Sequence, residues 1–254
     1  MLKFFRRIRQ QLLSENKFSK YLMYAIGEII LVVIGILIAL QINNWNEARK
    51  NHKKLTTAVQ SVYSDIVADG VLIQQRLPLV NQRNSKINGL IKRAYASETD
   101  LDTLVHIMQN EFPVRWYSSP TFNINTFSNL KATGTFDILP EEIKKAISNY
   151  YTTMETNQDY VEKVLDQYRS HLDDFVKRYN IIGRLYDANY KNSYMYNQTW
   201  RDIEGKDFSA RTAVLFAAYR VLYQAAKTEL ETNQQQIDAL LPLLKPYLEE
   251  KEHD

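Results

Sequence analysis

The chain contains no cysteine among its 254 residues. This absence excludes disulfide bonds, thiolate nucleophiles and cysteine-ligated zinc, and it is compatible with the cytoplasm and the periplasm alike. Glycine (7 residues) and proline (6 residues) are also scarce. Tight turns must therefore be few, which favours long helices over a many-stranded β fold.

Catalytic motifs are lacking as well. The four histidines are far apart in the sequence, and no H-E-x-x-H pair, phosphate-binding glycine loop or G-x-S-x-G elbow occurs. His171 lies near Asp173 and Asp174, but adjacent aspartates point in different directions on a helix, which indicates a solvated face. The sequence therefore predicts no catalytic residue, no metal site and no cofactor, and a non-enzyme is favoured.

Positive charge is concentrated at one end of the chain. Residues 1–20 carry a net charge of +5, whereas the whole chain carries only +3. A nucleic-acid-binding domain needs a basic face on its folded body, so nucleic acid is not expected as a partner. Residues 2–13 mix leucine, phenylalanine and isoleucine with arginine, which is typical of an amphipathic helix that rests on anionic membrane lipid.

A long apolar run follows the basic tail. Residues 21–40 contain a single charged residue, Glu28, and this length is enough to cross a ~30 Å hydrocarbon core. Aromatic residues flank the run, as they do at membrane interfaces. A transmembrane helix is predicted over residues 21–44. A cleaved signal peptide is the first alternative, although the run is long and no A-x-A-like site follows it. A buried core helix is the second, but it does not explain the basic and aromatic flanks.

The flanking charges predict the orientation. Residues 45–54 carry a net charge of +3, which is less than the +5 of the N-terminal tail. The positive-inside rule then places the N-terminus in the cytoplasm. The prediction is an inner-membrane protein with a cytoplasmic tail (1–20), one span (21–44) and a periplasmic domain (45–254).

Two stretches carry a family resemblance. The run KFFRRIRQQLLSENKFSKYLMYAIGEIILVVIGILIALQINNWNE resembles the N-terminus of an uncharacterised family of single-pass membrane proteins common in Bacteroidetes, and the match extends over residues 1–50. The stretch TFSNLKATGTFDILPEEIKKAISNYY (126–151) resembles a weaker second signature of that family. The resemblance implies an inner-membrane anchor and a helical, periplasmic domain, and it implies no reaction.

Apolar residues recur every three or four positions through most of the remaining chain, which predicts amphipathic helices. One helix is expected from Leu55 to about Ala94, as a possible stalk that continues from the span, with a kink or break at Pro78. Short helices are expected near 99–108 and before Gly134. Two long helices should begin at Pro140 and near Ser209, and Pro242 and Pro246 should end or bend the second. The predicted fold is all-α, an antiparallel bundle of about four helices.

Glu28 is the most unusual residue of the apolar run. At 3.6 residues per turn it shares one helix face with Val32, Gly35 and Ala39, and the last two form a small-x-x-x-small pair on which helices approach closely. This face is predicted to contact another transmembrane helix, either of a different membrane protein or of a second copy. Snorkelling of Glu28 to the cytoplasmic headgroups remains an equal alternative, and a proton-relay role is less favoured.

Two candidates lie outside the span. The segment 185–200 contains Tyr190, Tyr194, Tyr196 and Trp200, whose rings either pin a long connection to the bundle or form a ligand or partner surface. Asp69 falls on a helix seam, where a carboxylate needs a partner. The sequence thus favours a membrane-anchored scaffold, sensor or accessory subunit that acts through protein partners. The alternatives are a membrane-tethered enzyme, a ligand-binding module with its site near 185–200, and a self-associating structural protein.

Overall fold

The computed structural model describes residues 18–181, 193–200 and 203–249, and within these ranges it is all-helical, with no strand. The elements follow in the order α2 (Phe18–Ala94), α3 (Leu101–His106), the π-helix η1 (Ile107–Glu111), α4 (Asn125–Ala132), the 3-10 helix η2 (Thr135–Ile138), α5 (Glu141–Arg178), α6 (Tyr194–Trp200), α7 (Gly205–Leu244) and α8 (Pro246–Glu249). The chain divides into two compact units, Met1–Thr57 and Ala58–Asp254.

The described part of the first unit is the N-terminal portion of α2. Its large apolar side chains are exposed, from Leu22 (49% exposed) to Trp45 (65% exposed). An 18-residue window of α2 is apolar enough to cross a membrane, and none of that window is buried. The helix from Leu55 that was predicted to be a stalk also lies within α2. The division into residues 1–20, 21–44 and 45–254 stays a prediction.

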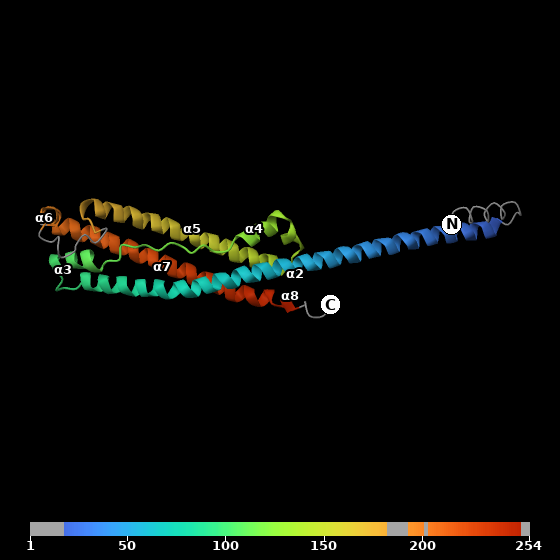
Figure 1. Ribbon diagram of the computed structural model, residues 1–254, viewed down its shortest axis with the longest axis horizontal. Coiled ribbons are helices and arrows are strands. Elements are labelled where there is room, and N and C mark those ends of the chain that lie inside the picture. The colour runs from blue at the N-terminus through green and yellow to red at the C-terminus, as the bar shows by residue number, and fades with distance from the viewer. Residues whose placement is uncertain (1–17, 182–192, 201–202, 250–254) are drawn as a thin grey trace. The chain divides into compact units, whose positions relative to one another are not determined.

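The second unit is a bundle of three long helices: the part of α2 from Ala58 onward, α5 and α7 (Figure 1). α5 and α7 are antiparallel, because Asn149 near the start of α5 donates a hydrogen bond to Gln236 near the end of α7. At the opposite end, the Tyr179 hydroxyl at the end of α5 donates to Asp207 in the first turn of α7. The predicted antiparallel bundle of long helices is thus confirmed.

The fourth element of the bundle is not a helix, and here the expectation of about four helices is wrong. Residues 113–124, which we call the crossing segment, have no regular secondary structure and run back along the bundle from η1 to α4 (Figure 1). Twelve extended residues reach up to about 40 Å, a distance that takes roughly 27 residues of helix at 1.5 Å each. The crossing segment therefore returns the chain along the bundle with few residues.

Side chains of α5 satisfy part of the backbone of the crossing segment. The Tyr168 hydroxyl donates to the carbonyl oxygen of Val114 (3.1 Å), and the Gln158 amide donates to the carbonyl oxygen of Pro120 (3.0 Å). An extended chain packed against helices has no neighbouring strand to pair with, so its buried polar groups need such side-chain partners. These hydrogen bonds compensate for the missing β ladder.

Asp69 of α2 binds the C-terminal end of the crossing segment through hydrogen bonds. Its Oδ1 accepts hydrogen bonds from the backbone N–H (3.0 Å) and the side-chain amide (2.8 Å) of Asn123, and its Oδ2 accepts from the hydroxyl of Tyr150 in α5 (2.8 Å). The side chain is fully buried. The sequence-based expectation of a hydrogen-bonded core carboxylate is confirmed, and the partner that it did not include is the crossing segment.

Two expectations about α2 and the start of α7 need correction. α2 continues through Pro78 without a break; the carbonyl of Gln74, which loses its donor there, belongs to an exposed residue where water can replace the bond. α7 begins at Gly205 rather than near Ser209, because buried Phe208 packs against Phe175 and stabilises the earlier turn.

At the ends of the two C-terminal long helices the proline predictions also change. α7 passes through Pro242 and ends at Leu244, and Pro246 then opens the one-turn helix α8. Pro140 is the N-cap of α5 rather than its first helical residue. Gly134 has a φ of 68° directly after α4, as expected of a helix C-terminal glycine.

We predict that Asp69→Ala lowers the free energy of unfolding of the full-length protein by about 3 kcal/mol, because three donors from two elements lose their acceptor in the core. Asp69→Asn keeps the shape and one carbonyl oxygen, so we expect a loss below about 1 kcal/mol. Denaturant unfolding followed by circular dichroism measures both. Asp65→Ala, one turn earlier in α2, is the matched control, and an equal effect of the two alanine variants would contradict the assigned role of Asp69.

Candidate functional site

The helix face predicted to contact another transmembrane helix is uncovered. Val32 is 54% exposed, and Gly35 and Ala39 are exposed as well, while Glu28 is half-buried. A Cβ atom added at Gly35 would meet no atom within 4 Å. The geometry thus leaves room for the backbone of a second helix at Gly35, and the assignment of this face as a contact remains a prediction.

The aromatic residues of the segment 185–200 differ in their burial and contacts. Trp200, 9% exposed, packs against the rings of Tyr179 and Phe208 at centroid distances of 6.3 and 6.4 Å. Tyr194 is 78% exposed, whereas the hydroxyl of Tyr196 reaches Gln109 in η1. Tyr190 lies outside the described residues. Trp200 therefore has the environment of a packing residue, and Tyr194 presents its ring to solvent.

The acidic residues around His171 form ion pairs on a solvated face, as expected. Asp173 pairs with Lys177 at 2.6 Å, and Asp174 pairs with Arg211 across the α5–α7 contact. Both aspartates are about two-thirds exposed. Within residues 18–181, 193–200 and 203–249, no group of three or more potential ligands could hold a metal ion.

Glu229 of α7 is a second buried carboxylate, which the sequence reasoning missed. Its side chain is 1% exposed, and its Oε2 accepts a 2.7 Å hydrogen bond from the hydroxyl of Tyr117 in the crossing segment. Burial raises the pKa of Glu229, and it also raises the pKa of Asp69 despite the three hydrogen bonds that favour the ionised form there. The two carboxylates therefore bind protons more readily in the folded chain than in the unfolded one.

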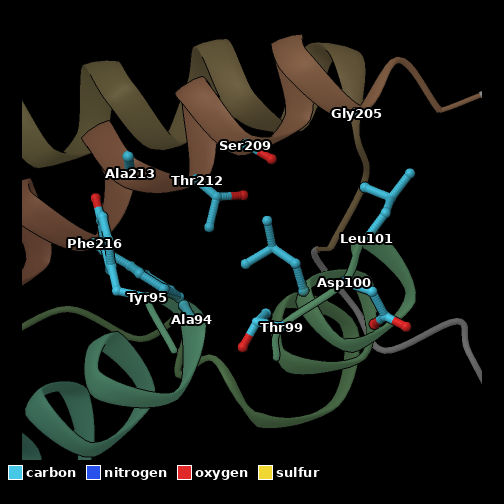
Figure 2. A pocket seen from close by; sticks show the side chains of 11 residues that line it. Ala94, Tyr95, Thr99, Asp100, Leu101, Gly205, Ser209, Thr212, Ala213 and Phe216 are labelled. Atoms are coloured by element: carbon cyan, nitrogen blue, oxygen red, sulfur yellow. The ribbon is translucent and has the colours of Figure 1, made fainter. Parts of the chain in front are cut away.

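One end of the bundle contains a cavity of about 330 Å³, which we call the end cavity (Figure 2). Three segments line it: the end of α2, the chain around the start of α3, and the first turns of α7. The lining residues are Ala94, Tyr95, Thr99, Asp100, Leu101, Leu104, Gly205, Ser209, Thr212, Ala213 and Phe216. None of them belongs to the segment 185–200 that was proposed for a ligand site from the sequence.

Small residues create this space. Alanine at positions 94 and 213 leaves the opposing helices without side chains that would fill the gap. Gly205 adds no side chain to the wall, and a Cβ there would be in ordinary contact with the side chain of Leu101 at 3.5 Å. Asp100 lines the cavity and is the N-cap of α3, where its Oδ1 accepts a 2.8 Å hydrogen bond from the N–H of Thr103.

Sequence reasoning found Asp69 but neither Glu229 nor the end cavity. Glu229 is in fact one helical turn before Asn233 and one after Ala225, all buried, so its place on the seam of α7 was a signal of the same kind as that of Asp69. The end cavity gave no such signal, because it depends on how the ends of α2, α3 and α7 meet.

The chain belongs to a family of unknown function, DUF6090, whose family model matches residues 28–221. The match begins at Glu28 inside the apolar run and ends in α7, so it covers most of the apolar run together with most of the bundle. No curated protein and no solved structure matches the chain. Membership of an uncharacterised family is thus confirmed, whereas the single-pass membrane character and the occurrence in Bacteroidetes that the resemblance implied stay predictions.

Glu229 generates a pH-dependent prediction. Because its pKa is raised in the folded state, the stability that it contributes is greatest at low pH and is lost as the pH rises from its unfolded value near 4.5 through the raised folded value. Glu229→Gln, which is always neutral, should therefore be more stable than wild type by about 1 kcal/mol at pH 7 and no more stable at pH 4.

Denaturant unfolding at a series of pH values measures this difference. Glu231→Gln is the matched control, since Glu231 lies two residues away, is 46% exposed and pairs with Lys227. Its stability relative to wild type should not follow the same pH profile. A pH-independent difference between Glu229→Gln and wild type would contradict the raised pKa.

Proposed function

We propose that this chain is a single-pass protein of the inner membrane. The segment 21–44 crosses the bilayer, the basic residues 1–20 lie on the cytoplasmic side against anionic lipid, and the bundle lies in the periplasm. The bundle then serves as a scaffold, sensor or accessory module that acts through a protein partner. The observation that carries the proposal is the uncovered apolar surface between Leu22 and Trp45.

The uncovered apolar surface of α2 is large. Fifteen large apolar side chains between Leu22 and Trp45 are about half exposed or more. Burial of such a side chain is worth about 1.5–3 kcal/mol when complete, so their exposure to water would cost on the order of 15 kcal/mol. That cost equals or exceeds the net stability of an ordinary domain. A hydrocarbon environment removes it without any protein contact.

The two alternative explanations fit less well. A core helix of a soluble protein is covered by its own fold, whereas none of the apolar window of α2 is buried. A cleaved signal peptide has a shorter apolar core, whereas residues 21–40 form a run long enough to span the bilayer, and no A-x-A-like site follows it. Both features support a retained anchor.

The orientation rests on charge. Residues 1–20 carry a net charge of +5 and residues 45–54 a net charge of +3, and the side with more lysine and arginine stays in the cytoplasm. No catalytic motif was found in the sequence, and the described residues place no metal-binding cluster in the bundle. Both points support a role through binding rather than catalysis.

The partner is reached through the helix face of Glu28, Val32, Gly35 and Ala39. Without a hydrophobic effect inside lipid, helices associate through close packing at small residues and through polar contacts. This face supplies both, since Gly35 and Ala39 permit close approach and Glu28 supplies the polar group. The occupant in this proposal is a second membrane-spanning helix, and the crosslinking experiment below distinguishes a second copy from another protein.

The first prediction concerns topology. Fusion of alkaline phosphatase to the C-terminus of the full chain should give an active enzyme, and fusion of green fluorescent protein should give a dark one, because the bundle lies in the periplasm. The fusion protein should resist extraction from membranes at alkaline pH and keep its full mass. A soluble product shortened by cleavage near the end of the apolar run would identify a signal peptide, and the reverse reporter pattern would overturn the orientation.

The second prediction uses the absence of cysteine, which makes any introduced thiol unique. Ala39→Cys lies on the proposed contact face, and Leu37→Cys lies two residues away on roughly the opposite face. Oxidative or bismaleimide crosslinking in intact membranes should give a discrete product for Ala39→Cys and little for Leu37→Cys. A product of twice the mass of the chain indicates self-association, and mass spectrometry identifies any other partner.

The same crosslink tests Glu28. Glu28→Gln and Gly35→Leu should each weaken the Ala39→Cys product several-fold, because both change the shared face. Gly27→Leu adds the same bulk about 100° away from Glu28 around the helix and is the matched control. Loss of the product with only one of the two face variants, or equal loss with Gly27→Leu, would contradict the shared-face contact.

A further inference from the structure

The end cavity contains a buried hydroxyl that no described residue satisfies. Thr212 is 2% exposed, and its Oγ1 has no hydrogen-bond partner among the described residues. Figure 2 shows the Thr212 side chain on the cavity side of α7, with its oxygen directed along the helix toward the Gly205 end. A buried hydroxyl without a partner destabilises the fold relative to a valine of the same shape, so its presence here points to a partner that is not part of the chain.

A second hydroxyl lies beside it. Ser209 precedes Thr212 by three residues on α7, so the two side chains share one helix face. Both line the end cavity, and Ser209 is exposed whereas Thr212 is buried. The two hydroxyls together form a short polar strip along one wall, at different depths in the cavity.

The remaining walls are mainly apolar and carry little charge. Leu101, Leu104 and Phe216 supply the largest apolar side chains. Asp100 is the one charged residue among the lining residues, and its carboxylate already caps α3 through Thr103. An anionic ligand would therefore meet a like charge at Asp100, and a cationic one would find only this single exposed carboxylate. A neutral ligand would leave its apolar part against leucine and phenylalanine.

We propose that the end cavity is a binding site for a small neutral molecule with an apolar body the size of one ring and a single hydroxyl or carbonyl group. The polar group binds the hydroxyls of Thr212 and Ser209, and the apolar body packs against Leu101 and Phe216. A cavity of about 330 Å³ is at the lower end of the range of small-molecule sites. This site lies entirely within the bundle and does not depend on the membrane anchor.

Protection of a single cysteine tests the location of the site. In the full-length protein in detergent micelles, Ser209→Cys places a thiol in the cavity wall, and Ala210→Cys places one on the next residue, about 100° around the helix. We use benzyl alcohol as the probe and measure the rate of reaction with a maleimide. The probe should slow modification of Cys at position 209 at least threefold, with a midpoint in the millimolar range expected for so small a molecule, and leave position 210 unchanged.

Selectivity tests the chemical class. Added benzyl alcohol should raise the melting temperature of the wild-type protein, by about 3 °C at ten times its Kd. Toluene, which lacks the hydroxyl, and benzylamine, which is cationic, should each act at least fivefold more weakly. Thr212→Val should melt about 2 °C higher than wild type without a probe and should lose the preference for benzyl alcohol over toluene.

Ala213→Leu fills the cavity. Because the micelle takes up the same amount of probe with this variant as with wild type, the variant is the control for that uptake. Benzyl alcohol should not raise its melting temperature. Equal shifts for Ala213→Leu and wild type, equal protection of positions 209 and 210, or no shift at the solubility limit of the probe would overturn the site. Tighter binding of benzylamine than of benzyl alcohol would overturn the neutral class of ligand.

Discussion

The apolar surface of α2 between Leu22 and Trp45 is the constraint on which the rest of the account depends. A helix that is apolar on every side must be covered by protein or by lipid. The bundle buries its own seams, from Val59 to Leu244, and none of the apolar window of α2 is buried. The apolar surface of α2 is therefore not covered by the core of the bundle, and the family match includes residues of both parts.

Inside the bundle, the crossing segment explains why polar residues are kept in the core. Asp69 and Glu229 each receive a tyrosine hydroxyl, and each contacts the crossing segment, through Asn123 and Tyr117 respectively. Burial of these carboxylates costs free energy, which the raised pKa values reflect. In return, the hydrogen bonds fix an extended chain in a position where a helix would otherwise lie, and so they specify its path.

The crossing segment also has a consequence for the end cavity. Because the chain returns along the bundle in twelve residues, the turn between α2 and the crossing segment must be formed by the short elements α3 and η1. α3 has only six residues, and its Leu101 meets the first turn of α7 at Gly205. If a full-length helix replaced the crossing segment, short elements such as α3 would not be needed at this end of the bundle, and there would be less room for a cavity between them.

The sequence predicted the elements whose signal is periodic. The apolar stripe of α5 from Ile143 to Phe175 is buried as expected, because spacing alone decides which face of a long helix is covered. The crossing segment was not predicted, since an extended chain packed on helices has no period of its own. The boundary at Ser209 was misplaced because burial of Phe208 outweighs the N-cap preference of serine.

The candidate sites also differ in whether a periodic sequence pattern could reveal them. The face of Glu28, Val32, Gly35 and Ala39 could be assigned from helix geometry, because it lies within one regular helix. The end cavity could not, since Tyr95, Leu101 and Thr212 come from three separate elements whose contact is a tertiary property. A lone threonine in a helix gives no indication that its hydroxyl lacks a partner.

The most direct test of the central claim is a spin-label scan of residues 29–40 in native-like membranes, with single cysteines introduced one at a time into the cysteine-free chain. Lipid contact predicts high collision rates with oxygen and low rates with a water-soluble nickel complex at every position, with a dip in the oxygen rate at Val32, Gly35 and Ala39, where a second helix lies. High rates with the nickel complex, or protection from both reagents on all sides of the helix, would show that water or protein surrounds this segment and would contradict the account.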